Sequence, residues 1–260
     1  YGCLSLYFNT SGIYNTAFGF QSLFANTTGA KNVAIGDSAL YSNTTGNYNT
    51  ATGANSLYKN TTGSRNTAYG FDSLYENSEG SNNTAFGYYS LRVNTTGDYN
   101  TALGNLSLQS NTTGGNNTAL GFQAGYNNQT GNANVFIGNS AGYNETGSNK
   151  LYISNSATQH LITGDFSSGN LSLGQSSGTV NVLNHLDVSG TSNLDAVDID
   201  GAVDMASTLT LAGNADFNGD LDVDGNLETD ALSINGTAVT STAAELNILD
   251  GVTATATELN

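Results

Sequence analysis

The polar and apolar positions of the first half of the chain repeat every 17 residues. The unit reads N-T-A-x-G-x-x-S-L-x-x-N-T-T-G-x-x, with the second Gly ten residues after the first. Two Gly would cost a helix about 1 kcal/mol each, and no i, i+3, i+4 apolar stripe survives this spacing. N-T-T-G is typical of a turn, because Asn bonds nearby backbone and Gly takes the positive φ that other residues avoid. We therefore predict two short strands and two turns per unit, forming one coil of a parallel β-solenoid or β-roll.

If each coil lies directly on the next at the ~4.7 Å spacing of strands, equivalent residues form ladders along the axis. Stacked Asn amides can then hydrogen-bond to one another, which explains why Asn recurs in a turn. A second Asn column begins at Asn15, and an aromatic column begins at Tyr7. The ladder residues that we single out are Asn9, Asn26, Asn43, Asn60, Asn77, Asn94, Asn111 and Asn128; Leu23, Leu40, Leu57 and Leu74; and Gly19, Gly36, Gly53 and Gly70.

A single coil of this size encloses few large side chains, so we expect neighbouring chains to supply further burial. We predict a homotrimer in which the Leu or aromatic columns meet around a common axis. Pairing between coils satisfies the backbone by itself, so the energy argument alone does not fix the number of chains.

Beyond the repeats we expect different elements. Residues 1–148 form the solenoid, and residues 149–178 form a capping segment of short strands and hairpins around Leu151-Tyr152-Ile153, Leu161-Ile162 and Leu171-Ser172-Leu173. In residues 179–238 apolar and acidic residues alternate, which predicts an intertwined three-chain β fibre segment. Residues 239–260 repeat at 13 residues, and Thr242-x-x-Glu245 and Thr255-x-x-Glu258 fit capping boxes of short helices.

The composition separates the two halves of the chain. Charged residues make up 10% of the 260 residues, and there is no Pro. In an ordinary domain about 25% of the residues are charged and about 5% are Pro. All five bases lie at or before Lys150, together with six of the 21 acids, and the other 15 acids follow Lys150. Such an acidic second half repels nucleic acid and anionic lipid. No run approaches 18 apolar residues, so we expect no membrane span.

Candidate chemistry is sparse, and we predict no enzymatic activity, no cofactor and no metal. Asp72, Glu76 and Glu79 lie together, but they replace turn or variable positions of one repeat and are interpreted as surface variation. His160 and His185 have no metal-ligand spacing. Cys3 is interpreted as a small packed side chain. The sequence Asp-x-Asp-Gly at 198–201 and 222–225 offers oxygen ligands for calcium but lacks the Glu of an EF-hand.

Three stretches resemble known families. N-V-A-I-G-D-S-A at 32–39, with N-T-A-Y-G at 66–70, resembles the head repeats of trimeric autotransporter adhesins, which implies a parallel β-roll of three chains. N-E-T-G-S-N-K-L-Y-I-S-N-S at 144–156 resembles tail-fibre proteins. T-S-T-A-A-E-L-N-I-L-D-G-V at 240–252 is similar to a tandem repeat of marine bacteriophage tail fibres.

Together these features predict the structural shaft of a bacteriophage tail fibre that displays a host-receptor-binding tip. Its partners would be its own copies, other fibre or virion proteins, and a host surface glycan or protein, and its location the virion or otherwise the extracellular space. Both ends fall in mid-repeat, so we expect a longer fibre. The alternative is a bacterial extracellular adhesin or surface filament. A sugar-cleaving spike would need two carboxylates facing each other across a sugar.

Overall fold

The computed structural model describes residues 2–174, 233–234 and 237–238. Contacts between residues divide the chain into two units, Tyr1–Asp187 and Val188–Asn260. The described residues contain strands and turns, and none of them belongs to a helix that could cross a membrane. The prediction of an all-β parallel solenoid is confirmed for the first unit.

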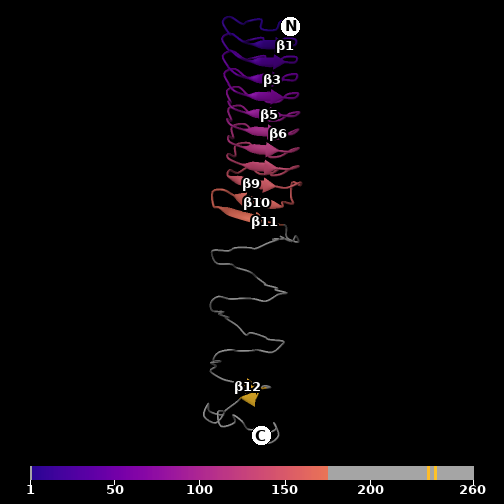
Figure 1. Ribbon diagram of the computed structural model, residues 1–260, viewed down its shortest axis with the longest axis vertical. Helices are drawn as coiled ribbons and strands as arrows, with labels where there is room; N and C mark the ends of the chain where they lie inside the picture. Colours follow the sequence, from indigo (N-terminus) through magenta and orange to yellow (C-terminus); the bar gives the residue numbers. More distant parts are fainter. Residues whose placement is uncertain (1, 175–232, 235–236, 239–260) are drawn as a thin grey trace, which may run out of the picture. The chain divides into compact units, whose positions relative to one another are not determined.

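The first unit is a stack of coils, each of which contributes one three-residue strand to a continuous sheet (Figure 1). Eight strands of this kind follow one another in chain order, and all of them pair in parallel. Their bounds are β1 Thr16–Phe18, β2 Val33–Ile35, β3 Thr50–Thr52, β4 Thr67–Tyr69, β5 Thr84–Phe86, β6 Thr101–Leu103, β7 Thr118–Leu120 and β8 Val135–Ile137.

The register reproduces the sequence period. Ala17 lies opposite Ala34, which is 17 residues later, and Ala34 lies opposite Ala51. The middle residue of each strand points inward and is buried, and both of its neighbours point outward. The interior is therefore narrow, with small residues on its strand side.

Our prediction of two strands per coil is wrong, because each coil has one strand and the rest consists of turns. In each coil, two residues of the corner that follows the strand adopt left-handed backbone, as at Gln21 (φ 51°) and Leu23 (φ 50°). Left-handed residues interrupt an extended segment, so no second strand forms there. The corner still bonds to the next coil, since the N–H of Leu23 donates to the carbonyl of Ala39 at 2.9 Å.

The sheet continues beyond the regular coils through β9 Lys150–Ile153, β10 Ile162–Asp165 and β11 Asn170–Leu173. Strand β9 pairs in parallel with β8, with Val135 opposite Leu151, one residue short of the regular step. The next two pairings are antiparallel. The short strands predicted in this region therefore form, and they complete an 11-stranded sheet.

In the second unit the described residues form a two-stranded antiparallel pair, β12 Ser233–Ile234 and β13 Thr237–Ala238. The predicted short helices of residues 239–260 and the Asp-x-Asp-Gly stretches lie outside the described residues. So does the rest of the predicted intertwined segment, together with residues 175–178.

Candidate functional site

The predicted Asn ladder lies inside the solenoid as one hydrogen-bonded column. Each Nδ2 donates to the Oδ1 of the Asn in the preceding coil at 2.6–2.9 Å, from Asn26 to Asn9 through to Asn111 to Asn94. The same Nδ2 also donates to the carbonyl of the Gly three residues later. Asn128 makes the bond to Gly131 but none to Asn111. The column thus joins seven of the eight Asn side chains.

The second Asn column, beginning at Asn15, is also buried and was not among the residues that we singled out. The Oδ1 of Asn32 accepts the backbone N–H of Asn49 at 2.9 Å, and the Nδ2 of Asn32 donates to the carbonyl of Gly46 at 2.8 Å. This column reaches Asn134, whose Oδ1 accepts the N–H of Lys150. The signal for it was the same 17-residue period.

The Leu ladder lies in the core of a single chain. Leu23, Leu40, Leu57 and Leu74 are 0% exposed and belong to one cluster with the inward Ala residues of the strands. Our expectation that Leu columns meet between chains is therefore wrong. The left-handed corner places each Leu side chain in the interior, where it fills the space opposite a small Ala.

The Gly ladder marks a close approach of backbones. Gly19, Gly36, Gly53 and Gly70 have φ between 128° and 143°, a backbone region that residues other than Gly rarely adopt. A Cβ at Gly36 would lie 2.6 Å from the carbonyl carbon and oxygen of Gly53 in the next coil. Only Gly allows the coils to stack so closely at this corner.

The outer face of the sheet carries an apolar stripe that we did not predict. We define the outer stripe as the third strand position of the coils, where six large apolar side chains are 37–63% exposed: Phe18, Ile35, Tyr69, Phe86, Leu103 and Leu120. The register continues it through Ile137, Ile153, Ile162 and Leu173. Phe20, Phe71, Tyr88 and Phe122 add exposed rings two residues further on. The sequence signal was the large apolar residue between Ala and Gly of the unit.

The aromatic column forms parallel ring stacks. Neighbouring rings from Phe24 to Tyr75 lie 5.0–5.1 Å apart with interplanar angles of 7–8°. Arg92 replaces the next ring, and its guanidinium lies over Tyr75 at 5.3 Å and bonds the carboxylate of Asp72 at 3.2 Å. Asp72 is 5% exposed, so its interpretation as surface variation is wrong. It is a buried partner of Arg92.

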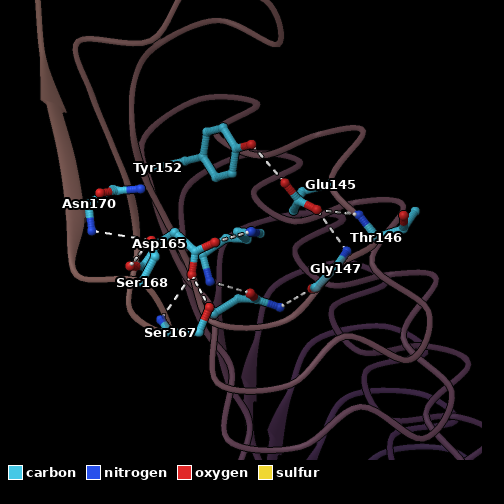
Figure 2. Close-up of polar contacts among 10 residues, drawn as sticks. Glu145, Thr146, Gly147, Tyr152, Asp165, Ser167, Ser168 and Asn170 are labelled. Atoms are coloured by element: carbon cyan, nitrogen blue, oxygen red, sulfur yellow. Dashed lines mark hydrogen bonds and ion pairs between the residues drawn. The ribbon is translucent and has the colours of Figure 1, made fainter.

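Polar side chains gather where the regular coils end (Figure 2). Glu145 accepts three hydrogen bonds: Oε1 from the N–H groups of Thr146 and Gly147 at 3.0 and 2.7 Å, and Oε2 from the hydroxyl of Tyr152 at 2.7 Å. Burial and the Glu145 carboxylate raise the pKa of Tyr152 to about 12. The ring of Tyr152 lies against the ring of Phe136 and the edge of His160.

A second charged contact fastens the same region. Lys150 Nζ lies 2.6 Å from Asp165 Oδ2, and Oδ1 accepts bonds from the N–H and hydroxyl of Ser167. The bonds from Lys150 and Ser167 hold the pKa of the Asp165 carboxyl well below its usual range. The Asp165 carboxylate raises the pKa of Lys150. Together these contacts join β9, β10 and the turn before β11.

Two hollows flank the Glu145–Tyr152 contact. The smaller, about 140 Å³, is lined by Asn144, Glu145, Tyr152 and His160 among others. The larger, about 310 Å³, lies over one face of β9, β10 and β11. In residues 2–174, no three His, Cys, Asp or Glu side chains gather closely enough to hold a metal ion. Cys3 is exposed, so our interpretation of a packed side chain is wrong.

Comparison with known proteins finds no matching family model, no similar curated protein and no similar solved structure.

Proposed function

We propose that this chain is a segment of the shaft of a bacteriophage tail fibre, in which three copies associate and hold a host-receptor-binding tip away from the particle. The observation that carries the proposal is the outer stripe. Its apolar side chains follow the register of the sheet from Phe18 to Leu173, and Thr52 of β3 is the one polar residue at this position between them. An exposed apolar surface that extends over most strands of a sheet is typical of a contact with another chain.

The interior supplies the stiffness that a shaft requires. Neighbouring coils bond to one another through backbone, and along much of the stack also through the two Asn columns and through stacked rings. These contacts all run parallel to the axis, so bending the rod strains many of them together. The resemblance of residues 144–156 and 240–252 to tail fibres favours the virion. The similarity of residues 32–39 to adhesin heads supports the alternative, a bacterial extracellular adhesin or surface filament.

The association is tested by sedimentation equilibrium and negative-stain microscopy of the full chain. We expect a slender particle with three times the chain mass. Replacing Tyr69 and Phe86 together by Asn should shift the protein toward monomer, because two neighbouring strands then carry a polar residue in the outer stripe. Tyr99→Asn is the matched control, since Tyr99 is 61% exposed but lies in a turn. A monomeric wild type would overturn the proposed assembly.

The biological context is tested by labelling with antibodies against the chain. Gold particles on the tails of phage virions would support the shaft of a tail fibre. Gold particles on a bacterial outer surface, together with their absence from virions, would favour the adhesin. Incubating the trimer with host polysaccharide and assaying reducing ends examines the sugar-cleaving class, and we expect no release.

A further inference from the structure

We propose that the larger hollow at the end of the solenoid binds a neutral sugar ring. The hollow measures about 310 Å³, at the lower end of the ~300–1,000 Å³ of small-molecule sites. Its residues come from three adjacent strands and from Glu145, all within one chain. Figure 2 shows Tyr152, Asp165, Asn170 and Glu145 around this region.

The floor of the hollow is a grid of side chains fixed by strand register. Tyr152, Thr163 and Ser172 lie opposite one another in one row across β9, β10 and β11. Lys150, Asp165 and Asn170 form the neighbouring row. Because residues i and i+2 of a strand share a face, all six side chains project from the same side of the sheet. This is the side on which Phe136, opposite Tyr152 in β8, enters the core.

The grid contains hydrogen-bonding groups that have no side-chain partner within residues 2–174. Among residues 2–174, the side chains of Thr163, Asn170 and Ser172 have no hydrogen-bond partner, and Lys150 uses one of its three N–H donors, on Asp165. Two hydroxyls, an amide and an ammonium group offer both donors and acceptors. Neighbouring hydroxyls on a ring need this mixture, since each hydroxyl both donates and accepts. The ring of Tyr152 supplies an apolar wall for the C–H face of such a ligand.

Charge and coordination argue against the other ligand classes. Lys150, Asp165 and Glu145 give the hollow a net charge of −1, which disfavours an anion. Both carboxylates already accept bonds from protein donors, and the Lys150 ammonium repels a cation. A neutral, hydroxyl-rich ligand satisfies the free groups without disturbing these contacts.

The association of chains proposed above uses the other face of these strands. Leu151, Ile153, Leu171 and Leu173 alternate with the grid residues and project from the opposite face of the same strands, which is the face of the outer stripe. Sugar binding nevertheless depends on the residues of a single chain. It can therefore succeed or fail independently of trimer formation.

The test is titration of the full chain with the methyl glycosides of glucose, galactose, mannose and N-acetylglucosamine, followed by saturation-transfer NMR and calorimetry. We expect at least one of them to bind with a Kd of about 1 mM, as suits a shallow site with a few hydrogen bonds. Asn170→Ala and Thr163→Val should each weaken binding ~10-fold, because each removes groups that bond the ligand.

Gln129→Ala is the matched control, since Gln129 is also an exposed amide but lies in a regular coil, and its binding should equal that of the wild type. Thermal unfolding monitored by circular dichroism verifies that each variant is folded. The proposal is overturned if no glycoside binds, if the Asn170 and Thr163 variants bind as well as the wild type, or if inorganic phosphate or calcium alone binds this hollow instead.

Discussion

Asn111 and Asn128 occupy equivalent positions in neighbouring coils, yet no hydrogen bond joins their side chains. Asn111 Nδ2 donates to Asn94 at 2.7 Å, but its own Oδ1 is buried without a partner, as is the Oδ1 of Asn128. The break falls at the coil where the Leu column ends. The Leu column ends there because Gly125 occupies the position of the next Leu. The amide ladder and the Leu column therefore end together, two coils before the chain leaves the regular repeat.

This break provides a test of what the ladder contributes to stability. Asn60→Ala removes donors to Asn43 and Gly63 and the acceptor for Asn77, so we expect it to lower the free energy of unfolding by about 3–5 kcal/mol. Asn128→Ala removes one bond, to Gly131, and should cost about 1–2 kcal/mol. Urea unfolding of both variants measures the difference. Equal losses would show that bonds between the Asn side chains contribute nothing.

The sequence sufficed to predict the features that repeat. Seventeen-residue spacing of Asn, Leu and Gly predicts that Ala17 meets Ala34 and that amides stack, because any other register would separate identical residues. The corners were less predictable. Leu has little intrinsic preference for left-handed backbone, and only the burial and bonding of the corner stabilise Leu23 at φ 50°.

Features that depend on contacts between dissimilar positions were missed. Nothing in the repeat indicated that Leu points inward while Phe18 and Phe86 point outward, since both positions are apolar. The contacts at the end of the regular coils could not be predicted either. Glu145 bonds Tyr152, and Lys150 bonds Asp165, in a part of the chain where the partners do not repeat. Pairings of this kind occur once and leave no periodic signal.

The close approach of the Gly column leads to a second prediction. Gly53→Ala places a Cβ 2.6 Å from the carbonyl oxygen of Gly70 at φ 128°, so coils must separate, and we expect a loss of about 3 kcal/mol or more. Gly169→Ala is the control, because Gly169 has φ 73° but no atom within 4 Å of an added Cβ. It should cost only ~1 kcal/mol of backbone strain. Similar losses for both in urea unfolding would mean that strain, and not coil contact, selects Gly.

A third prediction concerns Phe136, which occupies the inward strand position that is Ala in the preceding coils. A Cβ at Gly125 would lie 2.5 Å from its ring, so the ring fills space left by the missing Leu. Phe136→Ala should cost about 3–5 kcal/mol by leaving a cavity, and Gly125→Leu about 1–3 kcal/mol by overpacking. The double variant should be more stable than the sum of the two effects by at least ~2 kcal/mol. If the stability losses of the two single variants simply add in the double variant during thermal unfolding, the Phe136 ring does not fill the space of the missing Leu.

The last prediction follows from the raised pKa of Tyr152. The folded value of about 12 exceeds the ordinary value of 10.0, so the Tyr152–Glu145 contact contributes its full stability below pH 10 and loses it as the pH rises toward 12. The cause is desolvation and the neighbouring carboxylate, since an ionised Tyr152 would face Glu145 as a second negative charge. We expect the free energy of unfolding to fall by ~1 kcal/mol more in the wild type than in Tyr152→Phe between about pH 9 and 11.5, a value reduced for solvent screening of the partly exposed ring. Urea unfolding across this range measures it. The Lys150–Asp165 pair is present in both proteins, so its own titration cancels in the comparison. The control variant is Tyr99→Phe, at a ring that is 61% exposed, and its free energy of unfolding should change with pH as that of the wild type does. Parallel curves for the wild type and Tyr152→Phe would show that the Tyr152–Glu145 contact carries no pH dependence.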